Sequence, residues 1–189
     1  MPGMFWQARS FDGDVSSWDV GRVVDFWGTF CKASKFNRPL TSWNVRSAKS
    51  LSAMFYGATL FDKDLSSWNV SGVLNMEWMF REATSFNRDI GGWDVSSVND
   101  TSWMFAGATR FNQDISHWDV SSFMHIHGMF NGATSFSQNL CSWGSKLPPG
   151  VALIYDSTLE SPFVGTNCPD PSMPNMSASP PGPFCYPCS

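Results

Sequence analysis

Apolar side chains recur along this chain in a fixed order, with a period of 25 residues. One column of the repeat holds tryptophan and another holds phenylalanine, and the two advance in step: Trp18, Trp43, Trp68, Trp93, Trp118 and Trp143, with Phe11, Phe36, Phe61, Phe86, Phe111 and Phe136. Such self-similarity is the signature of a repeat architecture. It predicts a solenoid of six copies over residues 1–145, the first copy truncated, and a separate tail over residues 146–189.

The spacing of apolar residues changes within one copy, and the change predicts two elements. Around Trp93 and Val95 the pattern alternates, which is typical of a short strand whose Asp94 points away from the core. The run containing Met104 and Phe105 is predicted to be a short helix, because a residue type that caps helix N-termini precedes it in each copy. These predicted caps are Asp25, Ser50, Asn75 and Asp100.

A strand and a helix of this size cannot bury their apolar side alone, whereas stacked copies place like side chains over like. The predicted fold is therefore a repeat solenoid with one parallel β-sheet of short strands and with short helices on the opposite side. Each columnar Trp is predicted to belong to the core of this stack.

The full motif of the copies is I-S-x-W-D-V-S-S-V, followed by M-x-x-M-F-x-G-A-T-x-F-N-Q-D-I. It resembles the BspA-like leucine-rich repeat family of microbial and algal surface proteins, over about three quarters of the chain. The resemblance implies a leucine-rich-repeat-like solenoid, a surface or secreted setting, and a role in adhesion or protein contact. It transfers no catalytic residue, because the family has none in general.

In this arrangement the strand residues that face away from the core form one exposed sheet face, which is small, polar and mildly acidic. It is the candidate surface for a protein partner, with the residues Asp19, Asn44, Arg46, Asn69, Asp94, His117 and Asp119. The Asp and Asn side chains of one column are expected to form a ladder in which they satisfy one another and nearby backbone groups. The alternative is a glycan-binding module using the same face, which an exposed Trp78 or Trp103 would favour.

The motifs of catalysis and metal binding are missing from the sequence. It carries no G-x-S-x-G, H-E-x-x-H, phosphate loop or dinucleotide fingerprint. The histidines His117, His125 and His127 have no partner at metal-ligand spacing, so no metal or other cofactor is expected. A second acidic column is assigned to turns, because Asp hydrogen-bonds its own following backbone: Asp14, Asp64, Asp89 and Asp114. We therefore expect no enzyme but a module for protein–protein contact or surface adhesion, or an accessory subunit of a larger assembly.

Composition narrows the partners and the setting. The formal net charge is -4 and no basic run occurs, so nucleic acid is not expected as a partner. No stretch reaches the roughly 20 apolar residues that cross a bilayer, so no membrane insertion is expected. The first 25 residues lack the charged start and apolar core of a signal peptide. The cysteines and the family resemblance nevertheless indicate an extracellular or cell-surface location.

The tail is rich in proline, serine and cysteine, which predicts an irregular capping segment without helices. Cys141, Cys168, Cys185 and Cys188 cluster there, while Cys31 is isolated. With Cys31 left over, four cysteines allow three pairings. We predict disulfides between Cys141 and Cys168 and between Cys185 and Cys188. A metal or redox role for the Cys185-x-x-Cys188 pair is the alternative.

The N-terminal end has only Met1, Pro2 and Gly3 ahead of the repeat's own Met4 and Phe5. A stack of repeats needs a polar outer unit at each end, because its apolar columns are otherwise exposed. We therefore expect either further copies upstream or a protein partner that covers this end.

Overall fold

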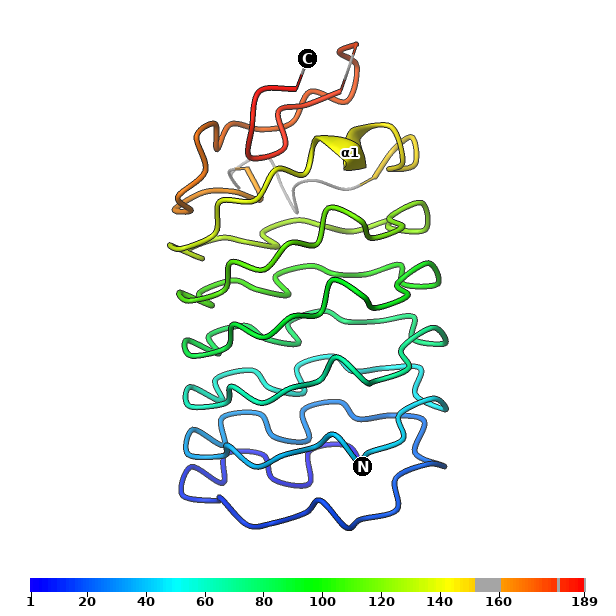
Figure 1. Cartoon of the computed structure of the whole chain (residues 1–189), viewed down its shortest axis with the longest axis vertical. Coiled ribbons are helices and arrows are strands. Elements are labelled where there is room, and N and C mark those ends of the chain that lie inside the picture. Colours follow the sequence, from blue (N-terminus) through cyan, green and yellow to red (C-terminus); the bar gives the residue numbers. More distant parts are fainter. Residues whose placement is uncertain (152–160, 180, 189) are drawn as a thin grey trace.

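The computed structural model describes residues 1–151, 161–179 and 181–188, and the chain winds into a stack of similar coils (Figure 1). Each coil takes 25 residues, so that equivalent residues of neighbouring copies lie one above the other. The stack runs along the longest axis of the molecule, from the first coils to the C-terminal tail.

The predicted sheet and helices are wrong. Over the described residues the only helix is α1, Cys141–Gly144, and no strand forms. Parallel pairing between coils is limited to single-residue bridges, at Asp25, Ser50, Asn75, Asp100 and His125. These bridges lie at the starts of the segments predicted to be helices, whereas each Trp-x-Val segment that was expected to be a strand lies between two tight turns.

The segment predicted to be a helix is a run of overlapping β-turns. In the second coil the N–H of Thr29 donates to the carbonyl of Phe26 (3.0 Å), and Gly28 between them has a φ of +58°. This left-handed value is the one that the third position of a type II turn requires. The same geometry follows four residues later, where Lys32 also has a φ of +58°. We call this segment the turn ribbon: residues 1–8, 26–33, 51–58, 76–83, 101–108 and 126–133.

Alternate amides of the turn ribbon bind the next coil instead of their own segment. The N–H groups of Phe26, Gly28, Phe30 and Lys32 donate to the carbonyls of Ser50, Ser52, Met54 and Tyr56 at 2.5–3.0 Å. A helix of two turns would use these amides internally, but it gains little because nucleation is costly. The stacked coil offers each amide a partner, and the predicted caps close turns as well: Oδ1 of Asp100 accepts the N–H of Ser102 at 2.9 Å.

The predicted direction of the side chains around the columnar Trp is confirmed in the second to fifth copies, although the strand is not, and the core position predicted for Trp18 is wrong because this ring is 39% exposed. Trp93 and Val95 are buried, and Asp94 between them is exposed. The Trp93 N–H donates to the Ile90 carbonyl at 3.1 Å, and the Val98 N–H donates to the Val95 carbonyl at 2.9 Å. Two successive turns therefore produce the alternation that a strand would also produce.

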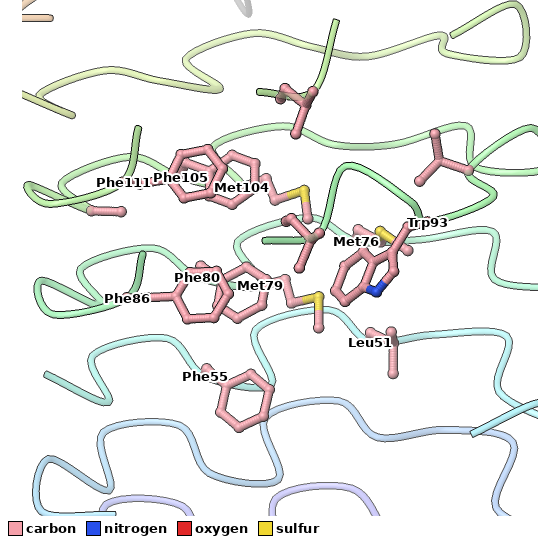
Figure 2. Close-up of a cluster of buried hydrophobic side chains, with 14 of the residues drawn as sticks. Leu51, Phe55, Met76, Met79, Phe80, Phe86, Trp93, Met104, Phe105 and Phe111 are labelled. Atoms are coloured by element: carbon pink, nitrogen blue, oxygen red, sulfur yellow. The ribbon is translucent and has the colours of Figure 1, made fainter. Parts of the chain in front are cut away.

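Phenylalanine pairs form the centre of the stack. Within one coil the Phe80 and Phe86 rings stack with centroids 3.9 Å apart, and Phe105 and Phe111 repeat this distance in the next coil. Phe80 and Phe105 lie 5.7 Å apart across the two coils. Figure 2 shows the two pairs one above the other, with Met79 and Met104 beside them. The methionine column is thus core filler.

Five of the six columnar tryptophans also link their coil to the preceding one. The indole N–H donates to a buried backbone carbonyl 28 residues earlier. Trp68 donates to the Leu40 carbonyl and Trp93 to the Leu65 carbonyl, each at a distance of 3.0 Å. The same bond recurs at three further tryptophans, Trp43, Trp118 and Trp143. The tryptophan therefore fills the core and satisfies a carbonyl that would otherwise be buried without a donor.

Truncation of a columnar Trp should destabilise the fold, because it empties a core site and removes the donor of a buried carbonyl. We expect Trp68→Ala to lower the free energy of unfolding by about 3–5 kcal/mol, the usual cost of emptying an aromatic core site. Trp68→Phe should cost about 1–3 kcal/mol, because the buried Leu40 carbonyl loses its donor. Denaturant unfolding measures both. Trp27→Ala is the control, since Trp27 is 39% exposed, and equal losses for the two alanine variants would contradict the prediction.

The tail covers the last coil with the same ring stacking and backbone hydrogen bonds that join one coil to the next. Phe163 stacks on Phe130 with ring centroids 5.6 Å apart. The N–H of Phe130 donates to the Pro162 carbonyl at 3.0 Å, and the N–H of Gly132 donates to the Val164 carbonyl at 2.8 Å. Residues 161–164 thus take the place that a further turn ribbon would occupy.

Two disulfides hold the tail, Cys141–Cys188 and Cys168–Cys185. The four cysteines expected to be oxidised are confirmed, but the predicted pairing of Cys141 with Cys168 and of Cys185 with Cys188 is wrong. The tail folds back antiparallel at Cys185, which sets this residue beside Cys168 and leaves Cys188 to reach Cys141. Cys31 is the free cysteine; it is buried, and burial raises the pKa of its thiol.

The pairing and its energetic effect can be measured together. Non-reducing peptide mapping should join Cys141 to Cys188 and Cys168 to Cys185, and Cys31 should be alkylated only after unfolding. The Cys168–Cys185 loop has a sequence separation of 17, so its removal by a double serine variant should cost about 3 kcal/mol in the chain-entropy model. A peptide joining Cys141 to Cys168 would refute the assignment.

Candidate functional site

The surface predicted to bind a partner is built from turns instead of a sheet. Its selected residues are all exposed and belong to three neighbouring columns of the repeat: Asp19, Asn44, Arg46, Asn69, Asp94, His117 and Asp119. We call the exposed residues within 17–21, 42–46, 67–71, 92–96 and 117–121 the polar face.

Each Asp or Asn of the central column closes a turn within its own coil. Oδ1 of Asp94 accepts the N–H of Ser96 at 3.1 Å, and Oδ1 of Asp119 accepts the N–H of Ser121 at 3.1 Å. The predicted bonds to nearby backbone groups are therefore confirmed, because a short side chain readily reaches the amide two residues ahead. The bonds predicted between side chains of this column do not form among the described residues. These local bonds fix the orientation of the exposed carboxylates.

A ladder between coils does form at the Phe-Asn-x-Asp segment, and the sequence reasoning missed it. The N–H of Asn87 donates to Oδ1 of Asp62 at 3.1 Å, and the N–H of Asn112 donates to Oδ1 of Asn87 at 2.9 Å. The signal that could have found it is an Asn or Asp directly after the columnar Phe in five copies. These residues belong to the scaffold, since their side chains are occupied by neighbouring coils.

The second acidic column closes turns, as its position predicted. Asp64, Asp89 and Asp114 each accept the N–H of the residue two positions later at 2.8–2.9 Å. The bond from the Ser116 amide lowers the pKa of the Asp114 carboxyl, so this side chain is ionised at neutral pH. Asp114 is also exposed, and its charge is available to a ligand.

Two hollows share Asp114 and His117 and together form a groove beside the polar face. Their volumes are about 420 and 490 Å³. We call it the His117 groove; its other polar side chains include those of Asp89, Gln113, Gln138, Asn139 and Lys146. These residues come from the fourth, fifth and sixth copies, so only the stacking of coils brings them together. Of the residues predicted to bind a partner, His117 alone lines the groove.

The groove includes a position where two glycines replace two serines. Gly91 and Gly92 stand where the preceding copy has Ser66 and Ser67. A Cβ added at Gly92 meets nothing within 4 Å, whereas one at Gly91 would lie 2.5 Å from the carbonyl oxygen of Asp114. Gly91 is therefore required by the close approach of two coils, and Gly92 leaves space that a ligand can fill.

The chemistry of the His117 groove suits binding by hydrogen bonds and charge. Among the described residues, no hydrogen bond joins the His117 ring to Ser116 or Ser142. Ser142 Oγ donates instead to the Ser116 carbonyl at 2.7 Å, and Lys146 Nζ donates to the Trp118 carbonyl at 3.3 Å. Carboxylates, amides and one ammonium group match the polar surface of another protein.

Another histidine, in the turn ribbon, is buried. His127 is 8% exposed, and its Nδ1 lies 3.1 Å from the hydroxyl of Ser102, which is fully buried. Burial lowers the pKa of His127; Asp100 opposes this effect and His125 adds to it. In the part of the chain that the structure describes, no group of three His, Cys, Asp or Glu side chains could hold a metal ion.

Stability should depend on pH through His127. The unfolded chain binds the proton with the ordinary pKa of about 6.5, and the folded chain binds it more weakly. The free energy of unfolding should therefore fall as the pH decreases from about 7 to about 5. His127→Gln should flatten this dependence, and His125→Gln, at an exposed position, should change it much less, because burial is the larger cause of the lowered pKa of His127. Denaturant unfolding at each pH tests this, and equal slopes for the two variants would contradict it.

The chain belongs to the family described as Mycoplasma protein of unknown function, DUF285, whose model matches residues 1–89 and again residues 61–148. The overlap of the two matches agrees with the repeated copies. No curated protein and no solved structure matches the chain. Among the residues that the structure describes, none forms a helix long and apolar enough to cross a membrane.

Proposed function

We propose that this protein is a non-catalytic interaction module that binds a protein partner through the polar face and the His117 groove. The observation that carries the proposal is the groove itself, where polar side chains of three successive copies line two adjoining hollows that share Asp114 and His117. Its size and its mixed donors and acceptors suit a protruding polar segment of another protein.

Preorganisation supports this proposal. The exposed Asp and Asn side chains of the polar face are held by bonds to their own backbone, as Asn69 is by the Ser71 amide at 3.2 Å. A ligand therefore does not have to order them, which lowers the entropic cost of binding. The acidic character of the face favours a partner with a basic surface.

The setting is extracellular or at the cell surface. Two disulfides indicate an oxidising environment. The likeness of the repeat motif to BspA-like surface proteins supports a role in adhesion, or as an accessory subunit held in a surface assembly.

Glycan binding by the polar face has less support. Sugar rings usually bind against exposed aromatic rings, and no Trp, Tyr or Phe side chain is among the described residues that line the His117 groove. Trp18 is the exposed tryptophan of this face, at 39%, and it lies in the first coil, away from the groove.

Gly92 allows a test that leaves the fold intact. Gly92→Gln places a side chain in the groove, where an added Cβ meets nothing within 4 Å, and should weaken partner binding at least about tenfold. Ser67→Gln is the matched control: it changes the same position one copy earlier, on the polar face but outside the groove, where a peripheral contact should change the affinity less than about twofold. The labelled whole chain is bound to intact cells of the source organism, before and after surface proteolysis.

Binding that is lost on proteolysis and in Gly92→Gln, but kept in Ser67→Gln, supports a protein partner at the groove. Equal binding by the two variants would contradict the site. Binding that survives proteolysis and is removed by glycosidases would contradict the class of partner.

A further inference from the structure

A second candidate surface lies on the turn ribbon, where three aromatic rings surround one cation. The guanidinium carbon of Arg81 lies 5.7 Å from the ring centroid of Tyr56, 6.0 Å from that of Trp78 and 5.3 Å from that of Trp103. All four side chains are partly exposed. Cation–π contacts hold the guanidinium in place. These residues come from three consecutive coils, and none belongs to the polar face.

The two tryptophans occupy a backbone position that suits glycine. In the six copies this position holds Gly3, Gly28, Ala53, Trp78, Trp103 and Gly128. Trp78 and Trp103 have φ values of +60° and +57°, in a region that bulky L residues rarely adopt. Trp78 also buries an indole N–H that has no acceptor among the described residues. The turn imposes this conformation on every copy, so it is the choice of two bulky rings here that the fold does not require, and these rings are candidates for contact with a ligand.

Trp103 lines a cleft of about 230 Å³. The backbone of Gly128 makes room for its ring, since a Cβ there would lie 2.4 Å from a ring carbon. The rest of the cleft is lined by Arg81, Glu82, Ala106, Gly107, Asn131 and Gly132. An aromatic wall, a strong donor, a strong acceptor and an amide therefore meet in one small hollow, the composition expected of a specific small-ligand site.

We propose that this cleft binds an uncharged saccharide. The C–H face of a sugar ring packs against an aromatic wall, and its hydroxyl groups both donate and accept hydrogen bonds. Arg81 supplies donors, Glu82 supplies acceptors and Asn131 supplies both. Arg81 Nε lies 3.7 Å from Glu82 Oε1, so the two charges offset each other and the cleft favours neither an anion nor a cation.

A peptide fits this surface less well. Extended peptides commonly bind by pairing with free backbone groups at an edge, and the backbone here is already paired between coils. The N–H of Glu82 donates to the Ala106 carbonyl at 2.7 Å, and the N–H of Gly107 donates to the Asn131 carbonyl at 2.8 Å. Recognition must therefore come from side chains, as it does for a glycan. The site is independent of the partner proposed for the polar face.

The test applies the whole chain to an array of neutral and acidic glycans, followed by calorimetric titration with a neutral glycan that binds. Trp103→Ala should weaken this binding at least about tenfold, because the aromatic wall is lost. Trp27→Ala is the matched control: Trp27 is 39% exposed on the same turn ribbon but does not line the cleft, and its loss should change the affinity less than about twofold. Thermal unfolding of each variant confirms that the fold is kept.

Glu82→Gln separates a neutral ligand from a charged one without touching an aromatic residue. It removes a charged acceptor and keeps the shape, so a neutral saccharide should bind about threefold to tenfold more weakly, whereas an anionic glycan would bind more tightly. An array without neutral ligands, a gain of affinity in Glu82→Gln, or equal affinities of Trp103→Ala and Trp27→Ala would each overturn the proposal. Gly92→Gln should leave saccharide binding unchanged. Failure of the saccharide proposal can therefore be told apart from failure of the partner proposal at the His117 groove.

Discussion

The backbone of each coil is satisfied largely by a neighbouring coil that lies in strict register with it. In the turn ribbon, alternate amides donate forward to the next coil, as Phe80 does to Met104 at 2.9 Å. The tryptophan indoles donate in the other direction, to the coil before, as Trp118 does to Ile90 at 3.1 Å. A single inserted residue would break both sets of bonds and leave buried polar groups unpaired. This requirement explains why the period of 25 residues never slips.

The same requirement decides where the copies are free to differ. Buried columns repeat because each side chain packs against its own equivalents above and below, whereas exposed positions carry no such demand. Both candidate surfaces arise from such differences: Gly92 and His117 shape one, and Trp78 and Trp103 shape the other. The scaffold supplies fixed positions, and the local exceptions to the repeat supply the chemistry.

The period, the buried columns and the oxidised cysteines could be predicted from the sequence, but the element types could not. The alternation around Trp93 is the same for a strand and for two turns, because both bury every second side chain there. Asp100 is equally suited to cap a helix or to close a turn. Whether a segment bonds internally or to the next coil depends on carbonyls 24 residues away, which no local pattern reveals.

The same limit applies to the sites. The turn role of Asp114 follows from its own neighbours and was predictable. The His117 groove depends on the approach of Gly91 to the Asp114 carbonyl, a contact between copies that appears only once the coils are stacked. The disulfide pairing depends on how the tail folds back, and composition does not specify that path.

Both disulfides lie at the C-terminal end of the stack, where they tie the tail to the coils beneath it. One joins Cys141, at the end of the last coil, to Cys188, and the other joins Cys168 to Cys185 within the tail. In an array coupled through nearest neighbours, a coil that packs against a cross-linked unit opens less readily on its own. The His117 groove and the Trp103 cleft lie toward this end. Reduction of the disulfides would therefore loosen the coils that carry both surfaces, and an oxidising environment would keep both assembled.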